Sequence, residues 1–120
     1  MNIVSNLSYF KKEVFELLRS PVFVMLTLLG NSVIGLSGSL FYYLEHGTNP
    51  KLHHFIDAIW WSFATATTTG YGDITPVTMA GKILGILLML LGTALFAMYT
   101  GLFAEIILSN SKKHSKTSKS

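Results

Sequence analysis

The sequence predicts an all-α membrane protein in which two transmembrane helices flank a re-entrant segment. Residues 22–44 contain no charged residue, and residues 79–108 contain only Lys82 and Glu105. Each stretch exceeds the roughly 20 apolar residues that a membrane-spanning helix needs. Between them, residues 67–73 form a polar, glycine-rich run, which is tolerated at membrane depth only in a water-filled cavity or inside protein. Two buried helices of a soluble protein are a poor alternative, since the charges lie almost entirely outside both stretches.

The first element is an amphipathic helix over residues 1–20. Apolar side chains recur there at helical spacing, three or four residues apart: Ile3, Leu7, Phe10, Val14, Leu17 and Leu18. We expect this helix to lie in the cytoplasmic membrane interface, where Lys11, Lys12 and Arg19 meet anionic lipids. An amphipathic terminus with no role in gating is the alternative.

The outer transmembrane helix is expected over residues 21–44, followed by a turret loop over residues 45–54. Ser20 suits the N-cap of this helix and Pro21 suits its first position. The aromatic run at 41–43 marks the outer membrane interface. The loop after it is exposed in this prediction, because it holds the turn-forming residues Gly47, Asn49 and Pro50.

A short re-entrant helix is expected over residues 55–67. Asp57 lies in its first turn, where a carboxylate complements the positive end of the helix dipole. The segment is too short to cross the membrane, so the helix should enter and stop inside it. Its C-terminal end carries partial negative charge, which favours a cation beside it.

The inner helix is expected over residues 79–108, after Pro76 and Thr78 end the preceding loop. At 1.5 Å per residue it is about 45 Å long against a bilayer core of about 30 Å, so it must tilt, bend or protrude. Residues 109–120 are rich in serine and lysine and too polar to bury a core. We therefore expect a disordered, basic cytoplasmic tail there.

The placement of charge predicts the orientation. Lysine and arginine residues precede the first apolar stretch and follow the second, whereas the loop between the helices holds only Lys51. The positive-inside rule then places both termini in the cytoplasm of a multi-pass protein of the cell inner (plasma) membrane. This topology accounts for the net charge of +3 and makes nucleic-acid binding a poor interpretation. A chain without cysteine has no disulfide or thiolate metal site. The sequence also shows no pairing of a nucleophile with a base that would indicate an enzyme.

The glycine-rich run carries the functional signal. Gly70 and Gly72 permit backbone conformations that turn carbonyl oxygens in a common direction. Residues 68–73, Thr-Thr-Gly-Tyr-Gly-Asp, resemble the selectivity filter of potassium channels, whose usual form is Thr-Val-Gly-Tyr-Gly-Asp. Residues 59–62, Ile-Trp-Trp-Ser, and residues 65–68, Thr-Ala-Thr-Thr, resemble the pore helix of bacterial two-helix potassium channels.

The resemblance implies a prokaryotic potassium channel that conducts K⁺ passively as a homotetramer, with no cofactor besides the permeant ion. The implied K⁺ ligands are the carbonyls of the filter, residues 68–72, namely Thr68, Thr69, Gly70 and Tyr71, with Gly72 at the outer mouth. The implied supports of the filter are Trp60, Trp61 and Asp73, and the Tyr71 ring is expected to pack on one of the two tryptophans. A weakly selective monovalent cation channel and a non-conducting membrane assembly subunit are the alternatives.

Two positions depart from the family pattern. Thr69 stands where the family usually has valine or isoleucine, and its hydroxyl needs a partner if it faces the protein behind the filter. Ala64 stands where some bacterial relatives have a glutamate that pairs with the filter aspartate. We therefore expect Asp73 to accept a hydrogen bond from the Trp60 indole, as in voltage-gated relatives, with altered filter inactivation as the consequence.

The inner helix holds the gating candidates, which are Gly92, Phe96, Thr100, Gly101, Ala104, Glu105 and Leu108. Gly92 aligns with the glycine hinge of the family, and close helix packing is its alternative role. Leu108 is expected to form a hydrophobic constriction. Glu105 either gathers cations or senses protons at the inner entrance, or pairs with a basic residue such as Arg19.

Overall fold

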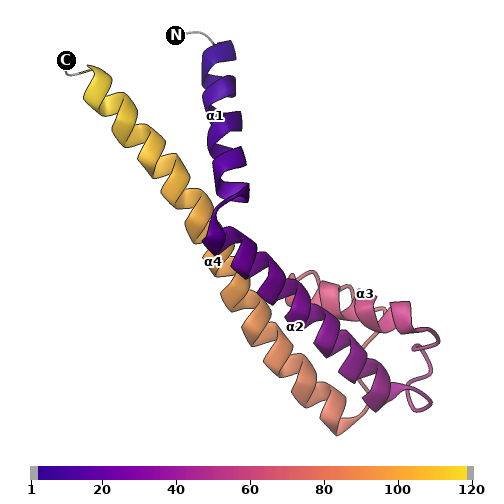
Figure 1. Cartoon of the computed structure of the whole chain (residues 1–120). Helices are drawn as coiled ribbons and strands as arrows, with labels where there is room; N and C mark the ends of the chain where they lie inside the picture. The colour runs from indigo at the N-terminus through magenta and orange to yellow at the C-terminus, as the bar shows by residue number, and fades with distance from the viewer. Residues whose placement is uncertain (1–2, 119–120) are drawn as a thin grey trace. The chain divides into compact units, whose positions relative to one another are not determined.

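The computed structural model describes residues 3–118, which form four helices and no strand. In chain order (Figure 1) the helices are α1 (Ile3–Leu18), α2 (Pro21–Glu45), α3 (Phe55–Ala66) and α4 (Met79–Ser118). Contacts divide the chain into two compact units. One unit is Leu28–Ala97, and the other comprises the residues up to Thr27 and those from Met98 onward.

Two of these helices are long and apolar enough to cross a membrane. They are Pro21–Glu45, with a mean hydropathy of 1.6, and Met79–Ser109 within α4, with a mean hydropathy of 2.1. Only 11% and 17% of the respective apolar windows are buried by the rest of the chain. A core helix of a soluble protein is mostly buried, so these exposed apolar surfaces agree with the predicted all-α membrane class.

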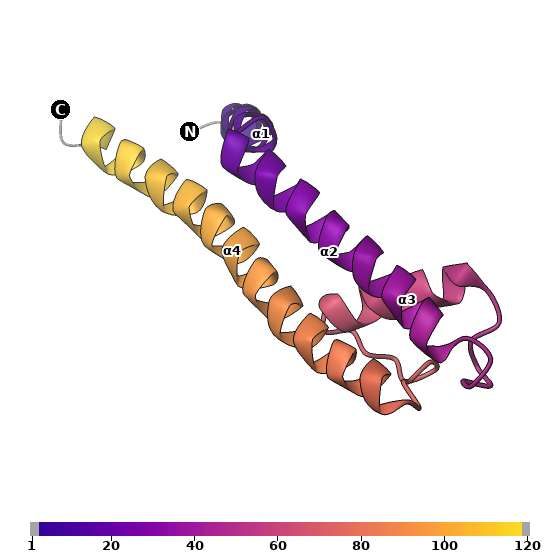
Figure 2. The same ribbon diagram turned by 60° about the horizontal axis from the view of Figure 1, so that its bottom comes forward.

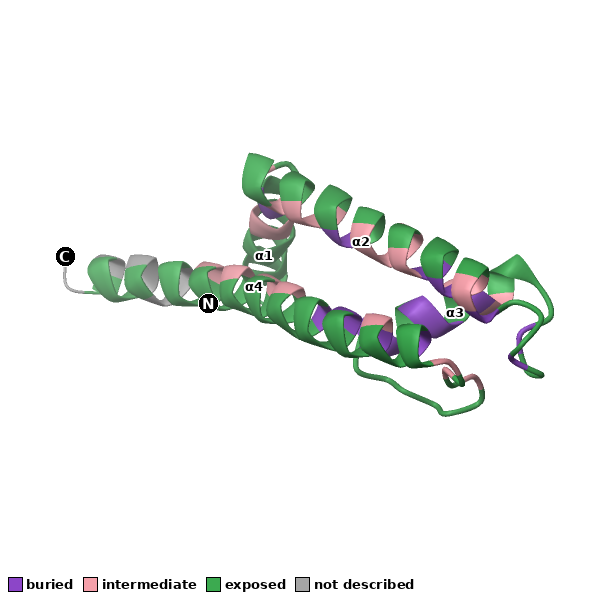
Figure 3. Cartoon of the chain, turned by 90° about the horizontal axis from the view of Figure 1, so that it is seen from below, coloured by how far each residue is buried: buried purple, intermediate pink, exposed green. Residues whose placement is uncertain are grey.

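The unit Leu28–Ala97 contains the short helix and the loop after it. Here α3 lies beside the C-terminal half of α2, and the loop leads back to the start of α4 (Figure 2). Gly38 favours the close approach of α3 to α2, because a Cβ there would lie 3.3 Å from the Ala58 carbonyl oxygen and from Ile59 Cα, and would displace the Ile59 side chain. Buried residues gather where the three helices face one another (Figure 3). They form one core cluster of Phe41, Leu52, Ala58, Trp61, Ala66 and Leu88.

In the other unit, the first turns of α2 contact α4. The Tyr99 hydroxyl donates to Thr27 Oγ1 at 2.8 Å, and the Tyr99 ring meets Phe23 edge-on with centroids 5.5 Å apart. The predicted start of α2 is confirmed, because Ser20 Oγ accepts a hydrogen bond from Phe23 N at 3.2 Å and Pro21 is the first helical residue.

Asp57 fixes the N-terminus of α3, as its place in the sequence predicts. Its Oδ2 accepts hydrogen bonds from His54 N at 2.8 Å and from His53 N at 3.1 Å. The bond from the His54 amide is the main reason that the pKa of Asp57 lies below its usual value, because it favours the charged carboxylate. The loop before α3 is thereby tied to the first turn of the helix.

The helix ends agree with the sequence to within one residue for α2 and α3, but not for α4. Disorder is expected from residue 109, whereas α4 continues through Ser118. Once a helix exists, each added residue gains one hydrogen bond, and lysine is a good helix former, so the polar segment prolongs the helix. Residues 119–120 of the expected tail and residues 1–2 of the N-terminal segment lie outside the described residues.

Candidate functional site

The loop between α3 and α4 has an unusual backbone. Thr68, Gly70 and Gly72 have positive φ angles of 62°, 52° and 83°, and they alternate with residues whose φ is not positive. This alternation of hand turns successive peptide groups the same way, so that the carbonyl oxygens of residues 68–72 can face one side. Thr68 adopts the left-handed region although it is β-branched, and such strain is concentrated at functional sites.

Main-chain hydrogen bonds hold this loop against the end of α3. Thr68 N donates to Thr65 O at 3.2 Å, and Gly70 N donates to Ala64 O at 3.0 Å. These two bonds fix the peptide groups 67–68 and 69–70 relative to the last turn of α3. The residues that the sequence predicts as ion ligands therefore lie together on one tethered segment.

Trp60 supports the outer end of the loop by two contacts. Its indole Nε1 donates to Asp73 Oδ2 at 2.9 Å, which is the hydrogen bond expected from the sequence. Its ring stacks on the Tyr71 ring, with centroids 5.7 Å apart and an interplanar angle of 7°. Of the two tryptophans offered by the sequence, Trp60 is therefore the one on which Tyr71 packs.

Trp61 points the other way and belongs to the core. It is 5% exposed, and its ring stacks on Phe41 of α2 with centroids 3.7 Å apart. On its other side it lies against α4, because a Cβ on Gly85 would meet Trp61 Cζ2 at 3.4 Å. Trp61 thus fixes α3 between the two long helices, and any support that it gives the loop acts through α3.

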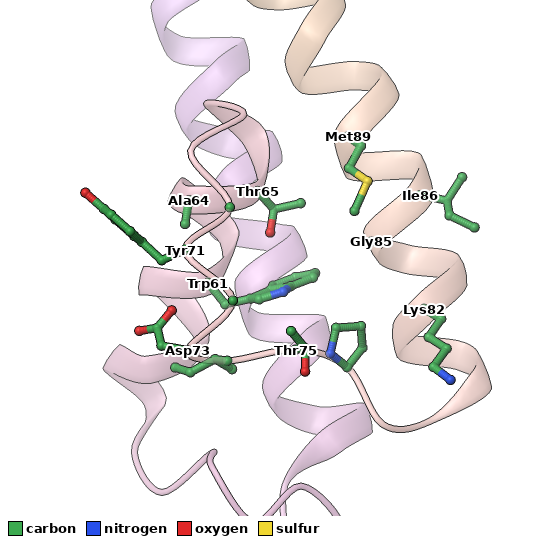
Figure 4. Close-up of a pocket in the computed structure, with 14 residues that line it drawn as sticks. Trp61, Ala64, Thr65, Tyr71, Asp73, Thr75, Lys82, Gly85, Ile86 and Met89 are labelled. Atoms are coloured by element: carbon green, nitrogen blue, oxygen red, sulfur yellow. The ribbon is translucent and has the colours of Figure 1, made fainter.

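A cavity of about 380 Å³ lies behind the loop (Figure 4). Its lining comes from the loop and from facing residues of α3 and α4, including Trp61, Thr65, Gly85 and Met89. In Figure 4 the Tyr71 side chain points away from α4, whereas the Trp61 side chain extends toward it. The loop is therefore supported by α3 on the Tyr71 side and is separated from α4 by the cavity.

The hydroxyl of Thr69, the residue that departs from the family pattern, has a partner behind the loop. Thr69 Oγ1 lies 2.9 Å from Thr67 Oγ1, and Thr67 Oγ1 donates to Phe63 O at 2.6 Å. Thr67 is the residue that caps the C-terminus of α3. The extra hydroxyl therefore joins a hydrogen-bonded chain that ends on the backbone of α3.

Glu45 is the supporting residue that the sequence does not reveal. The sequence predicts it at the start of an exposed turret loop, but it ends α2 and is fully buried. Its carboxylate accepts hydrogen bonds from Val77 N at 2.8 Å, from Thr78 N at 2.9 Å and from the Thr78 hydroxyl. Asn49 donates to the same carboxylate at 2.9 Å. The end of α2 is thereby joined to the segment between the loop and α4.

Asn49 extends this network, because its Nδ2 also donates to Thr75 O at 2.8 Å. Asn49 is 4% exposed and Leu52 is 3% exposed, so these two positions of the predicted turret are buried as well, while its remaining residues after Glu45 are exposed. The exposed-loop prediction is wrong for these residues because their side chains cover the segment that follows the functional loop. The sequence feature that accompanies this network is an acid, Glu45, at the end of an apolar stretch, with the hydrogen-bonding residue Asn49 four positions later.

Gly92 lies where α4 crosses the end of α3. A Cβ there would lie 2.3 Å from Ala66 O and 2.7 Å from Ala66 Cα. Real Cβ atoms do not approach backbone atoms so closely. Gly92 therefore has the close-packing role that the sequence offered as the alternative to a hinge. Bending at this glycine stays a prediction.

The other gating candidates are exposed residues of α4. The structure brings four of them together on one side of the helix, where Gly101, Ala104, Glu105 and Leu108 line the same hollow. Phe96 and Thr100 are also exposed in the single chain. On α1, Lys11 and Lys12 are exposed, and the Arg19 guanidinium lies 5.2 Å from the Phe15 ring centroid.

Comparison with known proteins identifies similar chains. A family model described as an ion channel matches residues 22–109. A voltage-gated potassium channel of Aeropyrum pernix is 41% identical over 63 residues, which cover 49% of this chain and 21% of the relative. A cyclic nucleotide-gated potassium channel of Rhizobium etli is 39% identical over 64 residues, which cover 52% of this chain and 18% of the relative. This chain therefore spans about a fifth of the length of these relatives.

Two solved structures share the arrangement of helices. A voltage-gated K⁺ channel pore module in a closed state in lipid membranes matches with a TM-score of 0.66 and 30% identity, covering 78% of this chain and 98% of that one. A voltage-gated K⁺ channel pore domain in a closed state matches with a TM-score of 0.59 and 33% identity, covering 68% and 90%. The fold is thus shared with these pore structures over most of their length.

Proposed function

The chain belongs to the ion channel family, and we propose that it forms the pore of a potassium-selective channel that conducts K⁺ passively as a homotetramer. The loop over residues 68–72 carries the proposal, because its alternating backbone allows a row of carbonyl oxygens at the end of a short helix. A family of ion channels is not a family of enzymes, in agreement with the expectation from the sequence.

The filter loop recognises K⁺ by replacing its hydration shell with backbone carbonyls. The carbonyls of Thr68, Thr69, Gly70 and Tyr71 supply the ligands, and Gly72 forms the outer mouth. The C-terminal end of α3 lies directly before Thr68 and carries partial negative charge, which favours a cation there. The ion is the cargo, and the mechanism uses no cofactor.

Several copies must meet at an axis, because one loop cannot surround an ion. Residues 67–73 are all exposed in the single chain, and Tyr71 and Phe96 are 69% and 60% exposed. In a homotetramer four loops enclose the ion pathway, and the apolar surfaces that the subunits leave uncovered meet lipid. The names of the two solved pore structures support this arrangement, since both are K⁺ channel pores.

The distribution of basic residues supports a topology with both termini in the cytoplasm and the filter on the outer side of the plasma membrane. In this topology α1 lies in the inner interface, where the exposed Lys11 and Lys12 meet anionic lipid headgroups together with Arg19. The hollow beside Ala104, Glu105 and Leu108 then faces the inner entrance of the pore.

The reversal potential of the purified protein in vesicles, with K⁺ on one side and Na⁺ on the other, tests this proposal. We expect a value near the potassium limit, because the residues that set the carbonyl row, Gly70-Tyr71-Gly72, are all present. A value near zero with clear current would favour the weakly selective cation pore. Absence of current under every condition would support the non-conducting alternative.

Two glycine variants serve as a matched pair in the same experiment. Gly70 and Gly47 both have positive φ, 52° and 87°, and neither would crowd a Cβ. Gly70→Ala therefore introduces backbone strain into the filter, whereas Gly47→Ala introduces the same kind of strain into the outer loop. Current should be lost in Gly70→Ala and kept in Gly47→Ala; equal effects would contradict the assignment of the filter.

Replacing Trp60 by phenylalanine should accelerate inactivation of the filter. The change keeps a ring against Tyr71 but removes the N–H that donates to Asp73, which is worth about 1–3 kcal/mol for a charged acceptor. The decay of K⁺ current at constant voltage measures this effect. Asp73→Asn removes the charge from the same bond, so the double variant should be no worse than Trp60→Phe alone; additive losses would mean that the two residues act independently.

A further inference from the structure

The side chains of Thr67 and Thr69 form a hydrogen-bonded chain behind the proposed filter. Their Oγ1 atoms are 2.9 Å apart, and Thr67 Oγ1 is 2.6 Å from the carbonyl oxygen of Phe63. Both threonines are in the same short segment, but they occupy different structures: Thr67 caps α3, and Thr69 is in the loop. The contact therefore joins a loop side chain to the helix before it.

The direction of these hydrogen bonds follows from the number of hydrogens. A carbonyl oxygen can only accept, so the single hydroxyl hydrogen of Thr67 is used toward Phe63. Thr67 can then only accept from Thr69, and the Thr69 hydroxyl is the donor. Thr69 is thus tied to the α3 backbone through one intermediate oxygen, and its hydroxyl hydrogen is directed away from any cation in the filter.

The backbone around Thr69 is held at both neighbouring residues but not at its own. Thr68 N and Gly70 N donate to carbonyls of α3, whereas Thr69 itself is tied to the helix through its side chain. The surroundings of this side chain are mostly non-polar, since it borders a cavity of about 180 Å³ with Trp60, Phe63, Ala64 and Tyr71. Both threonines are exposed in the single chain, so the contact depends on the geometry of the two side chains and not on burial.

We propose that Thr69 is a positioning residue of the filter, whose hydroxyl holds the loop on α3 through Thr67 and so prolongs the conducting state. The proposal rests on the channel function proposed above. It gives the extra hydroxyl a mechanical role and no role as an ion ligand. It also explains how the filter is anchored beside Ala64, a residue that offers no polar side chain.

Thr69→Val and Thr69→Ser separate the hydroxyl from the shape of the side chain. Valine keeps the branched shape and removes the donor, whereas serine keeps the donor. In single-channel recordings, loss of one hydrogen bond should shorten the mean open time by roughly two- to tenfold in Thr69→Val. Thr69→Ser should shorten the mean open time clearly less than Thr69→Val does. Equal open times in the valine and serine variants would overturn the proposal.

Thr67→Val tests the intermediate oxygen, and the double variant tests the coupling. If both hydroxyls belong to one chain, the double variant should open for about as long as either single variant, whereas additive losses would overturn the proposal. Ser39→Ala is the control, because it also removes a hydroxyl bound to a helix carbonyl but lies on α2. A shift of the reversal potential toward zero in Thr69→Val would show that the hydroxyl acts on the ion, and would overturn the positioning role.

A second measurement does not depend on conduction. The thermal midpoints of the oligomer in detergent, compared among wild type, Thr67→Val, Thr69→Val and the double variant, report the coupling between the two hydroxyls. Non-additive midpoints support the contact even if the wild type carries no K⁺ current. In that case the absence of current would refute the channel function, and the contact between the two threonines would stand. Additive midpoints refute the contact even if the wild type conducts.

Discussion

Replacing Glu45 by alanine is expected to lower the free energy of unfolding by about 3 kcal/mol or more, one of the largest losses for a side chain outside the filter. Alanine leaves the part-buried amides of Val77 and Thr78 and the buried Asn49 side chain without their shared acceptor, and each unpaired group costs about 1–3 kcal/mol when it is buried. The cost falls on the segment between the filter and α4. Loss of K⁺ current should therefore accompany loss of the assembled protein on thermal unfolding in detergent.

Glu45→Gln refines this test. Glutamine keeps the shape and one acceptor oxygen, but its NH₂ group faces a donor, so an intermediate loss is expected. Glu16→Gln is the matched control, since Glu16 is exposed on α1 and its replacement should change stability by less than about 0.5 kcal/mol. Equal stability of Glu45→Ala and wild type would mean that water replaces the carboxylate.

Gly81 offers an independent check of the same contact. A Cβ on Gly81 would lie 2.1 Å from Glu45 Oε1, so Gly81→Ala should disrupt the network from the other side. In a chain that already has alanine at position 45, the new methyl group finds space. The two changes should therefore be clearly non-additive, as expected for residues in contact.

The backbone angles of the loop over residues 68–72 and its contact with Trp60 were predictable because they depend on local spacing. The Gly70-Tyr71-Gly72 run fixes positive φ at two positions, and Trp60 reaches Asp73 because the helix and the loop are both short. The hydropathy of the two long helices was equally clear, since it needs only composition and length. These features follow from residues that are close in sequence.

The missed features depend on contacts between distant residues. Glu45 and Thr78 are 33 positions apart, and the acid at the end of the apolar stretch, with Asn49 four positions later, does not by itself reveal the distant partner that buries it. The partner of Thr69 was left open for a different reason, because it is only two residues away and the direction of the Thr69 side chain depends on the φ angles of its neighbours. The two adjacent tryptophans could not be told apart until their rings were seen to face opposite sides of α3.

Replacing Gly92 by alanine is expected to disturb the filter although position 92 is on α4. The new Cβ would overlap the carbonyl oxygen and Cα of Ala66, the last residue of α3, and these backbone atoms cannot move without moving the filter that follows. Overpacking of this kind costs about 1–3 kcal/mol, and more where backbone blocks the space. We expect a lower thermal midpoint and little or no K⁺ current from Gly92→Ala.

Gly101→Ala distinguishes this packing role from a need for flexibility. Nothing lies within 4 Å of a Cβ at Gly101, so alanine there should stabilise the helix by about 0.5–1 kcal/mol.

If Gly92→Ala keeps the wild-type midpoint but the channel no longer opens, glycine is needed at position 92 for bending. If the midpoint falls and Ala66→Gly does not restore it, the overlap with the α3 backbone is the cause, because that second change removes only the Ala66 methyl group. The contact of α4 with α3 would then link the inner helix directly to the geometry of the filter.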